Sequence, residues 1–377
     1  MTTGRQDYGI LRSSLILMRE DPRFELEVWA GGMHLSEVFG RTIDLIRADG
    51  MPVTEELDFL LPDRSAPCLE AGRATAAVGE ALARSRPDAL VLLGDRYETL
   101  AAGVAASIER TPIVHLHGGE ESEGAIDNAF RHALTKLSHL HLVSHASHAK
   151  RVLQMGEDPR AVVVVGAAGL DNLYRADLLG VPELESRLKL RLQQPVVVVT
   201  VHPTTLGGGS SATSEVEAVS QAMEMVAATY VVTQPNADSG GDSIRAYWKK
   251  WSAGKATVAL VDALGERDFW GLLRSATAVL GNSSSGIIEA PAAGLPVVNV
   301  GERQRGRLRP RHVVDVEPDA EAIARALRVA VQPETRQRLA QVPALYPSGP
   351  AAPRIVQAIV EWEIPRPAVK RFHEAAP

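Results

Sequence analysis

The feature that most constrains the fold is a regular alternation of short apolar runs with longer segments of helical periodicity. The runs are rich in β-branched residues, and they cover 89–94, 113–117, 139–144, 162–166, 196–201, 230–234, 257–261, 277–282 and 296–300. Alanine-rich helical patterns lie between them, for example at 73–87, 97–110 and 125–138. Strands that alternate with helices form parallel sheets with helices on both faces. The sequence therefore predicts an α/β protein.

The strand pattern restarts after Pro182, which indicates two sheets rather than one. A chain of 377 residues also suits two domains on the usual relation of length to domain count. We expect two doubly wound, Rossmann-like domains with the active site in a cleft between them. The predicted limits are 1–170 and 171–350, followed by a helical segment and tail at 351–377 that returns to the first domain.

The beginning of the chain is unusual for this architecture. A doubly wound domain normally starts with a central strand, yet only about three residues precede Gly4. Either the natural chain starts further upstream, or the domain tolerates an incomplete central strand.

Composition narrows the class of protein. The apolar fraction is 45%, the charged fraction 23% and the net charge −6, which gives no reason to expect a nucleic-acid partner. Cys68 is the single cysteine, so we expect neither a disulfide framework nor a thiolate metal site. With no membrane-length apolar run and no signal-peptide pattern, we expect a cytoplasmic protein without a membrane partner.

The segment GNSSSGIIEA, at 281–290, places three serines before an apolar stretch. One interpretation is a helix N-cap, in which a serine hydroxyl accepts a hydrogen bond from a free backbone amide. The other is an anion site, because amides and hydroxyls at a helix start can hold a phosphate. The segment alone does not choose between them.

Polar residues follow six of the predicted strands, where ligands bind in open α/β sheets. In the second half, these residues predict a diphosphate site that contains Ser283, Ser284, Arg303 and His202. Glu289 could accept hydrogen bonds from ribose hydroxyls, or it could be an ordinary solvated helix residue.

The first half offers carboxylates at the corresponding strand ends. Asp95, Glu120 and Asp127 are suited to general acid and base chemistry. A structural ion pair between Asp95 and Arg96 is an alternative role for the first of them.

Five histidines crowd the segment that follows these carboxylates. Their spacing does not match a metal-ligand set, so we expect structural or surface roles and no metal for His132, His139, His141, His145 and His148.

Six motifs, in order, resemble the UDP-N-acetylglucosamine 2-epimerase family and in particular its hydrolysing branch. The similarity spans nearly the whole chain and is carried by 94–103, 115–141, 165–173, 201–205, 234–241 and 281–307. The family has the two-domain glycosyltransferase B type of fold. The hydrolysing branch makes N-acetylmannosamine, or the corresponding 2-epimer of a 2,4-diacetamido sugar, for sialic or legionaminic acids.

The resemblance also implies roles for individual residues. Ser283 and Ser284 would bind the UDP diphosphate and Glu289 the ribose, and the nucleotide site would be completed by Arg5, His202, Asn236 and Arg303. Asp95 and Asp127 match carboxylates that transfer protons in the family, and His202 is a further catalytic candidate.

The chain departs from the family pattern at two positions, and at one of them Asn128 follows Asp127 where many relatives have a second aspartate. Several family members have a glutamate where this chain has His117. His117 can itself carry a proton near neutral pH, or Glu120 can take the part of the glutamate, and the sequence does not choose.

We therefore expect a hydrolysing 2-epimerase of a UDP-2-acetamido sugar that needs no cofactor and forms a homo-oligomer, either a dimer or a tetramer. A non-hydrolysing 2-epimerase and a UDP-sugar glycosyltransferase of the same fold are the alternatives. A sugar-nucleotide sensor without activity is a third possibility. The sequence identifies neither the amino sugar nor the nucleotide, which is UDP or GDP.

Overall fold

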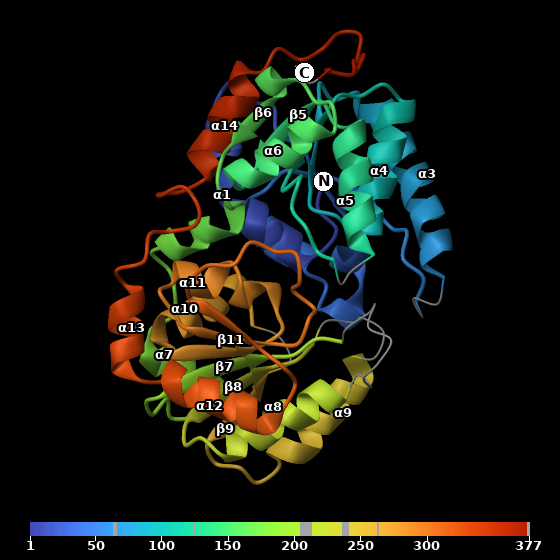
Figure 1. Cartoon of the computed structure of the whole chain (residues 1–377). Coiled ribbons are helices and arrows are strands. Elements are labelled where there is room, and N and C mark those ends of the chain that lie inside the picture. The colour runs from blue at the N-terminus through green and yellow to red at the C-terminus, as the bar shows by residue number, and fades with distance from the viewer. Residues whose placement is uncertain (63–65, 124–125, 204–212, 236–240, 262–263, 375–377) are drawn as a thin grey trace. The chain divides into compact units, whose positions relative to one another are not determined.

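The computed structural model describes residues 1–62, 66–123, 126–203, 213–235, 241–261 and 264–374. It divides the chain into two compact units, each built on parallel strands. Unit 1 comprises Met1–Glu120, Asp127–Asp171 and Tyr346–Pro377, and unit 2 comprises Glu121–Ile126 and Asn172–Leu345. The predicted α/β class with two Rossmann-like sheets is thereby confirmed (Figure 1).

From Pro67 onward the elements of unit 1 alternate along the chain as the sequence pattern predicts, whereas those before Pro67 were not predicted. The elements of unit 1 are α1 (Arg5–Glu20), β1 (Val28–Gly31), η1 (Gly32–Leu35), η2 (Glu37–Phe39), α2 (Ile43–Ala48), β2 (Val53–Leu57), α3 (Pro67–Ser85), β3 (Leu90–Leu93), α4 (Tyr97–Ile108), β4 (Ile113–Leu116), α5 (Asp127–Leu137), β5 (Leu140–Val143), α6 (Ala146–Gln154), η3 (Pro159–Ala161), β6 (Val162–Val164), the start of η4 (Ala168–Tyr174) and α14 (Ala352–Glu361).

The strands of unit 1 form two parallel groups, β1-β2 and β3-β4-β5-β6. Residues 1–3 lie between these groups. Thr2 bridges Ala30 in parallel, and the Met1 amino group donates a hydrogen bond to the Val91 carbonyl oxygen at 3.1 Å. These residues therefore occupy the position that a central strand would take.

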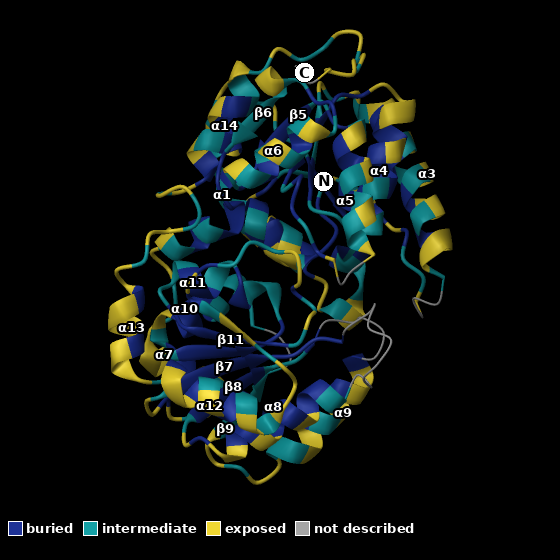
Figure 2. Ribbon diagram, viewed as in Figure 1, coloured by how far each residue is buried: buried dark blue, intermediate teal, exposed yellow. Residues whose placement is uncertain are grey.

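Helices cover both faces of the β3–β6 group. Side chains alternate between faces along a strand, so Leu92 packs with the cluster under α3 and α4, whereas Leu93 packs with the cluster under α1 and α14. Strands β4 and β5 are buried along their whole length, β6 is partly exposed, and Figure 2 shows exposed residues on the outer faces of the helices of unit 1. This two-sided burial explains why the strands are continuous apolar runs.

The elements of unit 2 complete the second half of the pattern. They are α7 (Val181–Leu188), β7 (Val196–Thr200), α8 (Ser214–Glu224), β8 (Thr229–Thr233), α9 (Gly241–Ser252), β9 (Val258–Val261), α10 (Glu266–Ser275), β10 (Ala278–Gly281), η5 (Ser284–Gly286), α11 (Glu289–Ala292), β11 (Val297–Val300), β12 (Val313–Val316), α12 (Ala320–Ala330) and α13 (Pro333–Leu339). The strand order is β12-β11-β10-β7-β8-β9.

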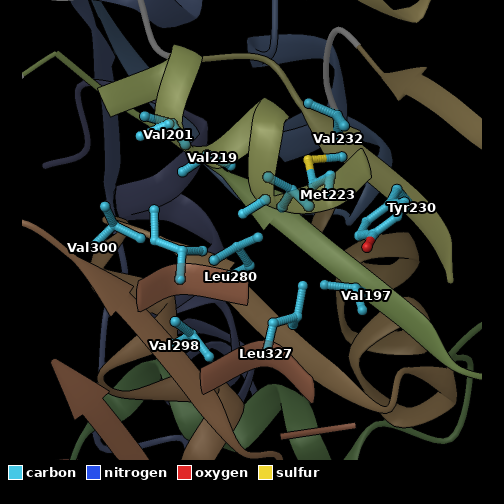
Figure 3. Packing of buried hydrophobic residues seen from close by; sticks show 14 of the residues in the cluster. Val197, Val201, Val219, Met223, Tyr230, Val232, Leu280, Val298, Val300 and Leu327 are labelled. Atoms are coloured by element: carbon cyan, nitrogen blue, oxygen red, sulfur yellow. The ribbon is translucent and has the colours of Figure 1, made fainter. Parts of the chain in front are cut away.

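The core of unit 2 is an apolar layer between this sheet and helices α8, α9 and α12. Figure 3 shows its labelled members, which are Val197, Val201, Val219, Met223, Tyr230, Val232, Leu280, Val298, Val300 and Leu327. Gly281, at the end of β10, has φ +133°, and a Cβ atom there would lie 2.0 Å from the Thr200 carbonyl oxygen. Only glycine therefore allows β10 to approach β7 this closely just before the serine-rich segment.

None of the helices in the described ranges combines the length and the apolar character that a membrane crossing requires.

Buried histidines make the stability of the fold depend on pH. Burial lowers the pKa to about 4 for His34 and to about 3 for His115. It also lowers the pKa to about 4 for His148 and to about 3 for His202. Below their ordinary value of 6.5 the unfolded chain binds protons at these sites, whereas the folded chain does not. We expect the melting temperature to fall as the pH is lowered from about 6.5 to about 4.

Calorimetry across this range tests the expectation, with two matched substitutions. His34→Gln should make the pH dependence shallower, because one proton fewer is taken up on unfolding. The exposed His373 provides the control, and His373→Gln should change the dependence less than His34→Gln does. A melting temperature that is constant or rises toward acid pH would contradict the expectation.

Candidate active site

A buried arginine organises the carboxyl ends of the strands in unit 1. Arg131, on α5, donates a hydrogen bond from Nη2 to Oδ2 of Asp95, which directly follows the end of β3. Its Nη1 atom donates to the Glu120 carbonyl oxygen and to Oδ1 of Asn128, both at 2.9 Å. Arg131 is only 2% exposed, whereas the side chain of Asp95 is 25% exposed. One guanidinium thus fixes the end of β3, the loop after β4 and the first turn of α5.

The structure gives Asp95 a different partner from the one predicted, and its catalytic role stays a prediction. Its ion pair is with Arg131, and the neighbouring Arg96 forms a bidentate pair with Glu98, at 3.2 and 3.0 Å. Glu98 is 1% exposed, so the Arg96–Glu98 pair is the structural one.

Asp127, the first residue of α5, lies close enough to Asp95 for their charges to interact. Burial, and then the charge of Asp95, raises the pKa of Asp127. A carboxyl group with a raised pKa exchanges protons more readily near neutral pH than an ordinary aspartate does. The predicted pair Asp95 and Asp127 is therefore brought together in unit 1.

His117 and Glu120, the two alternatives for one catalytic role, are in direct contact. The loop after β4 brings Nδ1 of His117 to 2.7 Å from Oε1 of Glu120. His117 has φ +65°, a left-handed conformation that is uncommon for a residue with a side chain. Gly119, with φ +76°, packs so closely that a Cβ atom would lie 2.5 Å from the His148 carbonyl oxygen.

In unit 2, a buried asparagine joins the ends of β7 and β10. Asn282 accepts a hydrogen bond from the His202 amide at 2.7 Å and donates to the His202 carbonyl oxygen at 2.9 Å. Its Nδ2 atom also donates to Oε2 of Glu215 at 2.8 Å. The carbonyl oxygen of Asn282 accepts hydrogen bonds from Arg303 at 3.2 Å and from Gln304 at 2.8 Å. This residue therefore connects three of the loops predicted to bind the nucleotide.

His202 and Arg303, both predicted nucleotide ligands, are neighbours in unit 2. Burial, and then the charge of Arg303, lowers the pKa of His202 to about 3. His202 is therefore neutral near pH 7, so its ring carries one N–H donor and one acceptor.

The serine-rich segment does not lead into one continuous helix that contains Glu289. The structure has a short 3₁₀-helix at Ser284–Gly286 and a separate short helix, α11, that begins at Glu289. Pro291 explains the interruption, because it has no N–H to donate to the carbonyl of Ile287. Glu289 is half-buried, and its Oε2 atom is buried.

The cap predicted as one alternative for this segment is present. Ser283 accepts a hydrogen bond from the Ser285 amide at 3.4 Å, and the two hydroxyls lie 2.8 Å apart. Ser283 and Ser284 remain partly exposed, so this capping arrangement does not bury them.

Two predicted nucleotide ligands lie outside this group. Arg5 is the first residue of α1 in unit 1. Asn236 lies outside the described residues. The roles of both stay predictions.

Sequence reasoning did not assign Arg131, Asn282 or Glu215 to the site. Arg131 lies one helical turn after Asp127, which is the only sequence signal for it. Among the residues that the structure describes, no group of three or more histidine, cysteine, aspartate or glutamate side chains could hold a metal ion.

The arrangement offers two kinds of chemistry. Unit 1 presents carboxylates and a histidine that can move protons, and unit 2 presents hydroxyls, a neutral histidine and an arginine that can bind an anion.

The chain is similar to a known protein family along most of its length. The sequence model of the UDP-N-acetylglucosamine 2-epimerase family matches residues 17–360. The GDP/UDP-N,N'-diacetylbacillosamine 2-epimerase (hydrolyzing) of Campylobacter jejuni is 34% identical over 317 residues, which cover 83% of this chain and 82% of that protein. The polysialic acid biosynthesis protein P7 of Escherichia coli is 32% identical over 340 residues, or 88% and 85% of the two chains.

A solved structure supports the fold independently. The UDP-GlcNAc 2-epimerase of Neisseria meningitidis, bound to UDP-GlcNAc, matches with a TM-score of 0.81 at 16% identity and covers 95% of this chain and 98% of that one. The predicted glycosyltransferase B type of fold is thus confirmed. From the family match and the two relatives above 30% identity, the chain belongs to the UDP-N-acetylglucosamine 2-epimerase family.

Proposed function

We propose that the protein is a hydrolysing 2-epimerase of a UDP-2-acetamido sugar, either UDP-N-acetylglucosamine or a UDP-2,4-diacetamido-2,4,6-trideoxyglucose. The observation that carries the proposal is the neighbouring pair Asp95 and Asp127, in which Asp127 has a raised pKa. Epimerisation needs proton transfer at carbon 2, whereas transfer of a sugar alone does not. The names of the relatives favour the hydrolysing branch and a diacetamido sugar.

The reaction proceeds by elimination followed by hydration. A base removes the proton from carbon 2 while the bond between carbon 1 and the diphosphate oxygen breaks, which gives a glycal and UDP. Water then adds its hydroxyl group to carbon 1, and an acid delivers a proton to the opposite face of carbon 2. The sum is nucleotide sugar plus water to UDP plus the free 2-epimer.

Residues of unit 2 stabilise the leaving group in this proposal. Ser283, Ser284 and Arg303 bind the diphosphate, whose negative charge increases as the bond to carbon 1 breaks. His202 donates its single N–H to the same group or serves as an acid, and Glu289 binds the ribose. Arg5 and Asn236 complete the nucleotide site.

Residues of unit 1 move the protons. Asp95 and Asp127 act on carbon 2, together with His117 and Glu120. The reaction requires no redox step, and we propose that it uses no cofactor and no metal.

Product analysis in heavy water tests the proposal and separates the alternatives. Incubation with UDP- and GDP-linked sugars should release the nucleotide and a free 2-epimer that carries deuterium at carbon 2, as measured by NMR. A nucleotide-linked epimer would indicate a non-hydrolysing enzyme, and product only after addition of an acceptor would indicate a glycosyltransferase. A free sugar without deuterium, or unchanged ligand, would also contradict the proposal.

We further propose a cytoplasmic homo-oligomer, a dimer or a tetramer, with domains at 1–170 and 171–350 and a returning segment at 351–377. Light scattering measures the oligomeric state, and limited proteolysis locates the domain limits.

A further inference from the structure

The surroundings of His117 contain a hydrogen-bond chain that the sequence did not indicate. Oε1 of Glu120 lies 2.7 Å from Nδ1 of His117 and accepts a hydrogen bond from the Ser144 hydroxyl at 2.8 Å. Oγ of Ser144 in turn lies 2.9 Å from Nδ1 of His148. Glu120, Ser144 and His148 are all buried, so water competes little for these bonds.

When Glu120 is ionised, the donor and the acceptor of each bond in this hydrogen-bond chain are determined. A carboxylate can only accept, so both Ser144 and His117 donate to it, and His117 carries its proton on Nδ1. Burial lowers the pKa of His148 to about 4, so that ring is neutral near pH 7. Because the Ser144 hydrogen points to Glu120, Nδ1 of His148 donates to Ser144.

In the neutral His117 ring, the other nitrogen is then an acceptor. Nε2 of His117 is buried and has no hydrogen-bond partner among the described residues. Such an atom costs free energy in the free protein, which a partner present only in a complex would offset. The left-handed backbone at His117 adds to that cost.

The close packing of Gly119 fixes this geometry. A Cβ atom on Gly119 would collide with the backbone of His148, and the Gly119 carbonyl oxygen accepts a hydrogen bond from Arg151 on α6. The loop that carries His117 is therefore held against the helix that carries His148.

We infer that Glu120 and Ser144 are positioning residues that hold His117 with its proton on Nδ1, so that Nε2 carries the lone pair that takes the substrate's proton. The inference rests on the proposed function, and it assigns complementary roles to His117 and Glu120 instead of choosing between them. His117 is the proton carrier, and Glu120 acts through it, as the carboxylate does in a serine-hydrolase triad.

A double-mutant cycle tests whether Glu120 acts through His117. Glu120→Ala should lower kcat by about 100-fold with KM nearly unchanged. Glu120→Gln should lower kcat less than Glu120→Ala does, because an amide oxygen still accepts the hydrogen bond from Nδ1. In a His117→Ala background, Glu120→Ala should have no further effect on kcat. Additive losses in the double variant would overturn the inference.

NMR of the histidine ring nitrogens tests the tautomer directly and needs no substrate. With nitrogen-15 in the histidines, the His117 signal, identified by its absence in His117→Ala, should show a protonated Nδ1 in the wild type. Ser144→Ala and Glu120→Ala should shift the population toward protonated Nε2. A wild-type ring protonated on Nε2, or a tautomer that neither substitution changes, would overturn the inference.

Two substitutions elsewhere in unit 1 serve as matched controls. Glu157→Gln alters another buried glutamate that binds a histidine, His141, at 2.9 Å, and Ser138→Ala removes a buried hydroxyl that donates to the Leu134 carbonyl oxygen. Both should leave kcat and the His117 tautomer unchanged. If the wild type releases no free sugar, the proposed function fails, while the NMR result still decides the inference.

Discussion

Asp95→Asn is expected to lower kcat by roughly 10²–10⁴-fold, the usual cost of losing a general acid or base. Asparagine keeps the size of the side chain and can still accept a hydrogen bond from Arg131, but it cannot take up a proton. The affinity for UDP should hardly change, because the predicted diphosphate ligands belong to unit 2. Turnover is measured as UDP release at saturating substrate, and affinity by calorimetry.

The control for this substitution lies just before the same strand. Asp88 precedes β3, is 69% exposed and pairs with Arg366, so Asp88→Asn removes a carboxylate without touching the candidate site. Because Asp95→Asn also weakens the ion pair of a buried arginine, turnover must be compared well below the melting temperature of the variant. Undiminished turnover of folded Asp95→Asn would remove Asp95 from the mechanism.

The strands that alternate with helices were predictable because each is a short apolar run bounded by polar residues. The predicted run at 89–94 contains β3, and the run at 196–201 contains β7. A parallel strand buried on both faces leaves this pattern in any sequence, whatever its tertiary partners.

Three strands, β1, β2 and β12, left no comparable signal. β2, with the sequence VTEEL, and β12, with the sequence VVDV, mix charged and apolar residues, and β1 has the sequence VWAG. Each of these strands can be recognised only from the segment that pairs with it. In β1, for example, Ala30 pairs with Thr2 and Val28 pairs with Val53 of β2. Tertiary pairing, rather than local propensity, decides these segments.

The candidate site shows the same division between local and long-range information. Asp95 and Asp127 could be proposed from the sequence because each stands at a strand end or a helix start, whereas His117 was indicated only by the family resemblance. Arg131 could not, because its function is to join Asp95 to the carbonyl of Glu120, across separations of 36 and 11 residues. Contacts of this kind follow from packing and leave no motif.

The contact between His117 and Glu120 is an intermediate case. Their separation of three residues was visible, but the left-handed backbone that turns Nδ1 toward the carboxylate was not. The sequence therefore presented them as rivals for one role, whereas the structure presents a bonded pair.

The second large effect is expected at the nucleotide. Arg303→Ala should weaken UDP binding by about 10- to 100-fold, because a charge-assisted hydrogen bond to a phosphate contributes roughly 1.5–3 kcal/mol. The substitution also removes the hydrogen bond to the Asn282 carbonyl oxygen, which Gln304 still binds at 2.8 Å, so the loop should keep its position. Calorimetric titration of UDP into the wild type and the variant measures the difference.

Arg309→Ala is the control for charge. Arg309 belongs to the same segment and pairs with Asp315 at 3.0 Å, so its removal changes the net charge of unit 2 equally without removing a predicted phosphate ligand. If long-range charge alone attracted UDP, both variants would lose affinity equally, and the loss would disappear at high salt. A loss confined to Arg303→Ala that persists at high salt requires direct contact with the diphosphate. Wild-type protein that shows no affinity for UDP would refute the nucleotide site itself.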